Sequence, residues 1–338
     1  MASERTQRAV DVALAIPELL ESILAQLDIT TLLVSASRVS KRWKALMDES
    51  PAVQQALFFS PILCFGDARD EDQGHRTASE QPIRRINPLL ARKFDKCFFD
   101  FGPTYAFHRR ANSFYELSWS PRPTKIVQEI WGGWSQSRPE EMDDEKAALQ
   151  KAYNESFTRK GASWRRMLVS QPPPPGLGYL RFDISDIPAE GHLIKSAMIR
   201  PKSDSPFAGL RMGQLYDLVQ NEVGHHGRHS LWFRVLHGRA PGNVALSKAK
   251  ETIARFMGET NVVVEFMHAD DTSLPNHPKD PADAIEFDAA FRSEEYREVE
   301  VKVEEETGYP AEFPMFEGQF VVWHWKLLEY ERIAMVSG

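Results

Sequence analysis

The chain has 338 residues, of which 42% are hydrophobic and 26% charged, proportions that are typical of a globular protein and exclude wholesale disorder. The formal net charge is −7 and the isoelectric point lies near 5.9, which argues against a general nucleic-acid binder, because such proteins need cations to neutralise phosphates. Two cysteines, Cys64 and Cys97, are too few for a disulfide framework or a cysteine-rich zinc site, and no apolar run is long enough to span a membrane.

The N-terminal segment is not expected to be a signal peptide. It is charged within its first residues, and its apolar part is interrupted by Asp11, Pro17 and Glu18. We therefore expect an intracellular protein, cytoplasmic or nuclear, in which both thiols are reduced.

The first helix is predicted to begin at Pro17, because the fixed φ of proline suits the first helical position. Glu18 follows in the first turn, where the helix dipole favours negative charge. One apolar face at spacing i, i+3, i+4, i+7 is formed by Leu20, Ile23, Leu24 and Leu27. Ile16 and Leu19 extend this apolar surface.

Three more short helices are predicted before residue 60. Asp28 or Thr30 can cap the second, and Ser37 can cap the third. Ser50 and Pro51 are typical of a cap and first residue of a fourth helix. The apolar residues of these helices are Leu32, Leu33, Val39, Trp43, Leu46, Met47, Val53, Ala56 and Leu57. Helices this short cannot bury so much apolar surface among themselves, so some of it must meet the rest of the chain or a partner protein.

Polar and mixed segments follow. Residues 67–85 are predicted to be a loop, residues 120–143 mix prolines, glycines and tryptophans, and residues 143–159 are predicted to be an exposed helix. A short amphipathic helix is expected within 161–171, ended by the prolines of 172–175.

The C-terminal half mixes strands and helices without a strict βαβ order. Period-two patterns predict strands at 177–184, 230–238, 261–269, 295–305 and 318–333. Helical spacing predicts helices at 210–223 and 248–258, and a proline-rich loop is predicted at 271–284. We therefore expect an α+β fold, with an N-terminal three-to-four-helix module over 11–60, a connecting region over 61–160 and an α+β domain over 161–338.

The N-terminal pattern resembles a known domain. Pro-Glu-Leu-Leu at 17–20, Ile-Leu-x-x-Leu at 23–27, Leu-Leu at 32–33 and Val-x-x-x-Trp at 39–43 resemble an F-box, in the form found in filamentous fungi. In many F-boxes one residue separates the proline from the glutamate, whereas here the two adjoin. The gap from Leu33 to Val39 is one residue longer than in many animal versions, a change expected to affect the turn between the second and third helices.

The resemblance implies helices that dock on a Skp-type linker protein, which joins them to a cullin scaffold in an SCF ubiquitin ligase. The residues that it implies for linker contact are Ile16, Pro17, Leu20, Ile23, Leu24, Leu27, Leu32, Leu33, Val39 and Trp43. Some of them must instead pack within the module. Trp43 is expected to be the strongest contact, so the Trp43→Ala change is predicted to abolish linker binding.

In this family the portion after the F-box captures a target protein, and residues 162–173 also resemble a segment of fungal F-box proteins. The resemblance thus implies a substrate receptor that is not itself an enzyme and needs no cofactor or metal. The charge balance and the absence of a long apolar run predict that it binds neither nucleic acid nor membrane. Two alternatives are a linker-bound protein acting outside a cullin ligase and, as an outsider, a metal-dependent enzyme with a helical docking module.

The enzyme alternative depends on three histidines, His225, His226 and His229, whose spacing on a helix could place ligands on one zinc ion. Gly224 and Gly227 weaken such a helix, and a solvated helix end or turn is the better interpretation.

Three features are candidates for a target-binding surface. Two tryptophan pairs, at 131 and 134 and at 323 and 325, are either core residues or aromatic anchors. The acidic stretch 294–306 is either a half-solvated strand or a surface for a basic target.

Overall fold

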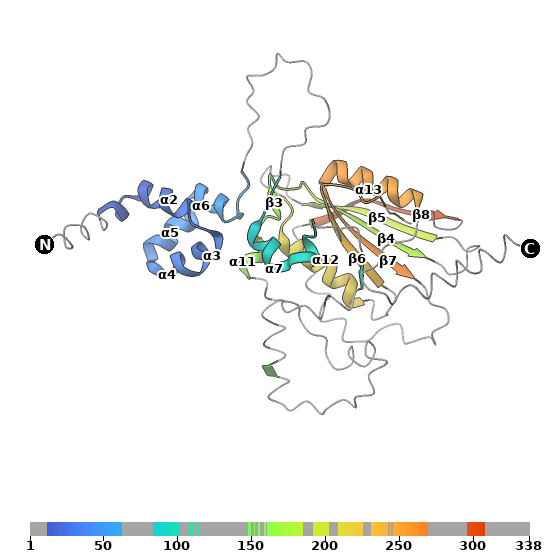
Figure 1. Cartoon of the computed structure of the whole chain (residues 1–338), viewed down its shortest axis with the longest axis horizontal. Helices are drawn as coiled ribbons and strands as arrows, with labels where there is room; N and C mark the ends of the chain where they lie inside the picture. The colour runs from blue at the N-terminus through green and yellow to red at the C-terminus, as the bar shows by residue number, and fades with distance from the viewer. Residues whose placement is uncertain are drawn as a thin grey trace, which may run out of the picture.

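A computed structural model describes residues 12–62, 84–101, 108–110, 161–184, 192–202, 209–225, 231–242, 246–269 and 296–307, together with residues 114, 148, 149, 152, 155, 159 and 244. Short helices at the N-terminus are followed by strands in sheets with helices packed on them, which confirms the predicted α+β fold (Figure 1). Among the described helices, none is long and apolar enough to cross a membrane.

The N-terminal helices are α2 (Pro17–Ala25), α3 (Ile29–Thr31), the π-helix η1 (Leu32–Ala36), α4 (Ser37–Val39), α5 (Lys41–Glu49) and α6 (Pro51–Ala56). Pro17 and Pro51 occupy first helical positions, as predicted. The Asp28 carboxylate, rather than Thr30, caps α3 by accepting from the Thr31 amide at 3.0 Å. The Ser50 hydroxyl caps α6 by accepting from the Val53 amide at 3.1 Å.

The predicted cap at Ser37 is wrong. Its hydroxyl donates to the Leu33 carbonyl at 2.8 Å inside a continuous helical run. Ser40 has extended backbone and caps α5 instead, accepting from the Trp43 amide at 3.1 Å. Sequence alone does not choose between two serines with the same capping preference.

The longer gap between Leu33 and Val39 coincides with the π-helical turn of η1. A π-turn closes with an i→i+5 hydrogen bond and so holds one more residue than an α-turn. The extra residue is thus taken up inside the helix, and α4 still ends at Val39, immediately before the Ser40 cap.

The main sheet has six strands in the order β2-β6-β7-β4-β5-β8. Their bounds are Arg109–Arg110, Leu231–His237, Val262–Ala269, Leu177–Ile184, His192–Pro201 and Tyr296–Glu306. β4 and β7 are parallel, and the other neighbours are antiparallel. Four of these strands match predicted ones. β5 was not predicted, because its apolar residues do not alternate along its length.

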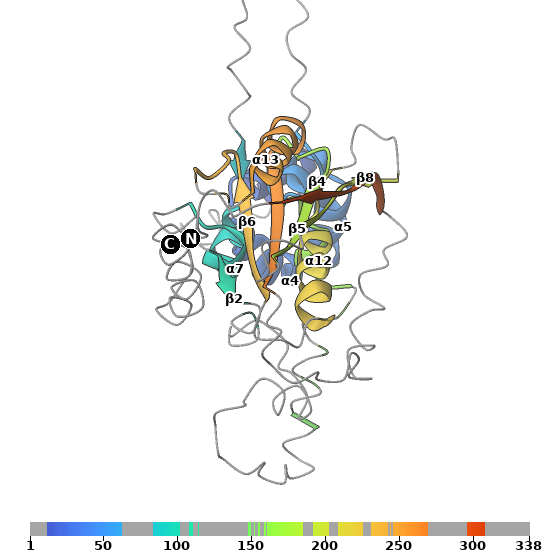
Figure 2. The ribbon, with the colours of Figure 1, turned by 90° about the vertical axis from the view of Figure 1, so that its right-hand side faces the viewer.

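Helices cover both faces of the sheet. α13 (Ser247–Thr260) packs on one face with Leu180 and Phe182, whereas α12 (Met212–His225) and α7 (Pro88–Phe98) pack on the other with Tyr179. In Figure 2 the end of the molecule that contains the main sheet faces the viewer, and the N-terminal helices lie behind the sheet.

The predicted helix within 161–171 is shorter than expected. α11 spans Ser163–Arg166, and Ser170–Gln171 forms strand β3, which pairs with β1 (Arg85–Ile86). Met167 leaves the helical conformation because residues 168–171 form hydrogen bonds with other segments instead.

The segment after α6 joins the N-terminal helices to the sheet domain. The Leu168 amide donates to the Phe58 carbonyl at 2.8 Å. The Gln171 side-chain amide donates to the Gln55 and Ser60 carbonyls at 2.9 and 3.0 Å. One hydrophobic cluster runs from the N-terminal helices through Phe58 to the sheet. Leu168 and Gln171, within the 162–173 segment, therefore attach the N-terminal helical module to the sheet domain.

Several predictions fall outside the described residues: most of the 67–85 loop, the 120–143 segment, the 271–284 loop, the 318–333 strand, both tryptophan pairs, Cys64, and His226 with His229. Within the predicted helix 143–159, residues 148, 149, 152 and 155 are described as helical and exposed. Cys97 is buried and is not part of a disulfide. The bounds of the three domains stay predictions.

Candidate functional site

Large hydrophobic side chains are exposed on the N-terminal helices. Ile16, Leu19 and Ile23 are between 41% and 46% exposed and follow one side of α2 at spacing i, i+3, i+7. Val34 on η1 and Val39 at the end of α4 are 50% and 58% exposed. We call these five residues the N-terminal apolar surface.

The structure sorts the ten residues predicted for partner contact into three groups. Leu20, Leu24 and Leu32 have no exposed surface, so they pack within the module. Leu27, Leu33 and Trp43 are partly buried against the same core. Ile16, Pro17, Ile23 and Val39 are exposed.

Two members of the N-terminal apolar surface were not among those ten residues. Leu19 lies three residues after Ile16, so helical spacing was enough to find it. Val34 lies in the π-helical turn of η1, and the extra residue before Val39 does not indicate which side chain of that turn is exposed.

Four cationic residues lie close to Val39 in the sequence. Arg38, Lys41, Arg42 and Lys44 are all exposed, and they lie on either side of Val39 in the sequence. The Arg42 guanidinium donates to the Ala15 carbonyl and so holds α5 against the start of α2. Exposed apolar side chains with charged neighbours are typical of a protein-binding surface, and these four cations favour an acidic partner.

A second candidate is a buried charged cluster in the sheet. Arg234 on β6 lies opposite Glu265 on β7, with 2.6 Å between Nε and Oε2. His108, just before β2, lies 3.2 Å from the other oxygen of Glu265. All three side chains are 2% exposed or less.

Burial raises the pKa of Glu265, but the nearby charges and hydrogen bonds of Arg234 and His108 outweigh it and hold that pKa well below its usual range. The cluster is enclosed, so we interpret it as structural. Among the residues that the structure describes, no group of three His, Cys, Asp or Glu side chains is arranged to hold a metal ion.

The ring of His237 is expected to make the stability of the protein depend on pH. Burial lowers the pKa of its ring to about 4, and Nε2 donates to the Phe98 carbonyl at 2.7 Å. The unfolded chain takes up a proton below about pH 6.5, whereas the native ring stays neutral. We expect stability to fall as pH drops from 6.5 to 4, by at most about 3 kcal/mol because the ring keeps some exposure.

The test is urea unfolding of the wild type and of His237→Gln, which keeps a donor but does not titrate. The variant is expected to lose the additional pH dependence between pH 6.5 and 4. Identical pH profiles for the two proteins would contradict this assignment.

Comparison with known proteins identifies the N-terminal module. The family model for the F-box domain matches residues 16–52, so the chain contains an F-box domain at the place where its sequence resembles one. F-box domains in general are the part by which substrate receptors of SCF-type ligases bind a Skp-type linker. No curated protein and no solved structure matches the chain.

Proposed function

We propose that this F-box chain is a substrate receptor of an SCF ubiquitin ligase, of the form found in filamentous fungi. Its N-terminal apolar surface binds a Skp-type linker, the linker joins it to a cullin scaffold, and the rest of the chain captures a target. The supporting observation is the half-exposure of five large hydrophobic side chains beside a fully buried core, all within or adjoining helices of the matched region 16–52.

Energetics indicate how this surface binds. Burying the exposed halves of five aliphatic side chains contributes roughly 4–7 kcal/mol, which only matches the free-energy cost of association. The exposed cations close to Val39 and the partly buried Leu33 and Trp43 must therefore contribute as well. Trp43 also packs on the module core, so its removal weakens the module as well as the interface.

The proposed role needs no catalytic residue in this chain. A receptor accelerates ubiquitin transfer by raising the effective concentration of the target beside the transfer enzyme. The hydrogen bonds from Gln171 and Leu168 to residues 55–60 support this role, because they fix the F-box relative to the sheet domain. We assign this activity to the cytoplasm or the nucleus.

The test is co-expression with a fungal Skp-type linker. The wild type is expected to form a one-to-one complex by size exclusion with light scattering. Ile23→Glu and Val39→Glu are each expected to weaken linker binding by at least about thirtyfold, with an unchanged unfolding midpoint, because both side chains face solvent. The matched control is Ala52→Glu, which adds the same charge at an exposed position of α6.

A folded wild type that forms no complex, or Glu variants that bind as well as Ala52→Glu, would contradict the proposal. Addition of a cullin then separates two roles. A complex that recruits the cullin supports the ligase receptor, whereas one that does not supports the alternative of a linker-bound protein acting outside a cullin ligase.

A further inference from the structure

A second group of exposed hydrophobic side chains lies at the sheet edge. Leu193 on β5 and Val301 and Val303 on β8 are 40%, 51% and 62% exposed. Figure 1 shows the N-terminal helices at one end of the molecule and β8 at the other. The two exposed apolar groups therefore lie far apart.

A β-bulge creates this second group. Val299 pairs with Met198 and Lys302 with Ser196, so two residues of β8 lie opposite the single residue Ala197. Glu300, within the bulge, has a left-handed φ of 54°. The bulge reverses the alternation of side chains.

Val299 thus packs against the α13 cluster, whereas Val301 and Val303 lie on the face of β5 that carries Lys195 and Leu193. The predicted strand is present, but its valines do not share one face.

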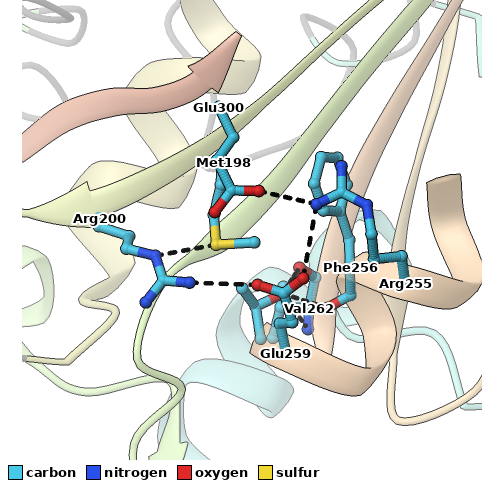
Figure 3. Close-up of polar contacts among 8 residues, drawn as sticks. Met198, Arg200, Arg255, Phe256, Glu259, Val262 and Glu300 are labelled. Carbon is cyan, nitrogen blue, oxygen red and sulfur yellow. Dashed lines mark hydrogen bonds and ion pairs between the residues drawn. The ribbon is translucent and has the colours of Figure 1, made fainter. Parts of the chain in front are cut away.

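The inner side of β8 is attached to α13. Figure 3 shows Arg255 between Glu300 and Glu259, and Arg200 bound to Glu259. The Arg255–Glu300 distance is 2.8 Å. At the far end of the strand, both oxygens of Glu306 accept from the Ser247 and Lys248 amides at 3.0 Å and so cap α13. These contacts hold β8 against α13 and leave the face that carries Val301 and Val303 exposed.

The remaining charge on β8 is acidic. The strand carries five glutamates and two cations. Glu300 and Glu306 are bound to α13. The Lys248 ammonium donates to the Glu305 backbone carbonyl, but among the described residues no ion pair joins a cation to the carboxylate of Glu304 or Glu305. Lys195 pairs with Val303, and Lys302 lies on the face of β8 opposite the valines.

We propose that the free edge of β8 binds an extended basic segment of a target protein as an added strand, an inference that rests on the receptor role proposed above. Among the described strands β8 pairs with β5 alone, and a strand edge is a template for another strand. Apolar residues of the segment lie beside Val301 and Val303. Its basic residues lie at the acidic end of β8, where Glu305 shares the face of the valines and Glu304 lies on the other face. A second copy of this chain is a poor occupant, because two acidic edges repel each other.

The test uses two fluorescein-labelled decapeptides and the full chain. In one peptide valine alternates with lysine, and in the other valine alternates with glutamate. Anisotropy titration is expected to show about tenfold tighter binding of the lysine peptide. E304Q/E305Q is expected to weaken that binding about fivefold and to reduce its salt dependence, and V301S/V303S to weaken it about tenfold.

The matched controls are E251Q and V12S, which make the same changes at exposed positions elsewhere and are expected to bind the peptide as the wild type does. Hydrogen exchange of residues 296–306 is expected to slow when the lysine peptide is added.

The proposal fails if both peptides bind alike, if the β8 amides are already fully protected in the free chain, or if the chain dimerises and V301S/V303S makes it monomeric. Linker binding by the same variants is measured in parallel. Linker binding without peptide binding overturns this inference alone, whereas peptide binding without linker binding overturns the receptor role and leaves the edge site standing.

Discussion

Replacing Arg234 by methionine is expected to lower the free energy of unfolding by about 3–5 kcal/mol, because it leaves the Glu265 carboxylate charged and buried without its main partner. Urea unfolding at pH 7 measures this loss as a lower midpoint with an unchanged slope. The surface variant Arg200→Met removes an ion pair that is more than a third exposed, and it is expected to cost less than about 1 kcal/mol.

The double variant Arg234→Met/Glu265→Leu measures the net contribution of the intact ion pair to the free energy of unfolding. The single variant measures a different quantity, which is the loss when one charge stays buried without its partner. Apolar residues of similar size often replace a buried ion pair with little loss. We therefore expect the double variant to recover most of the stability that the single variant loses. A single variant as stable as the wild type would show that water reaches Glu265 and that the cluster is not enclosed.

Phe58→Ala is expected to destabilise the chain by about 3–5 kcal/mol. The ring is fully buried where the F-box helices meet the sheet domain, and the Arg85 guanidinium lies 5.7 Å from its centroid. The loss is measured by urea unfolding. We also expect one cooperative transition in the wild type to separate into two in the variant, because the ring belongs to the core shared by both parts.

Phe58→Gly distinguishes packing from backbone conformation. Phe58 has a φ of 60°, a left-handed value that costs a non-glycine residue about 1 kcal/mol or more. Glycine loses the same ring but relieves this strain, so Phe58→Gly is expected to be about as stable as Phe58→Ala or more so. A glycine variant less stable than the alanine variant by 1 kcal/mol or more would contradict the left-handed assignment.

Local signals in the sequence determined the identity and order of most elements. Pro17, and Ser50 with Pro51, mark helix starts through fixed φ and side-chain capping, which depend only on neighbouring residues. Alternation over 177–184 and 261–269 predicted β4 and β7, because period two alone places side chains on opposite faces of a strand. The F-box pattern belongs to the same kind of evidence, and the family match at 16–52 agrees with it.

The tertiary structure alone decided which apolar residues are available to a partner. Ile23 and Leu24 are adjacent members of one predicted face, yet one is 43% exposed and the other is fully buried, because the neighbouring helices cover only part of α2. Val301 and Val303 face solvent because a single extra residue in β8 reverses the alternation of the strand. Periodicity specifies the faces of an element, whereas burial depends on what packs against each face, and contacts between distant segments set that packing.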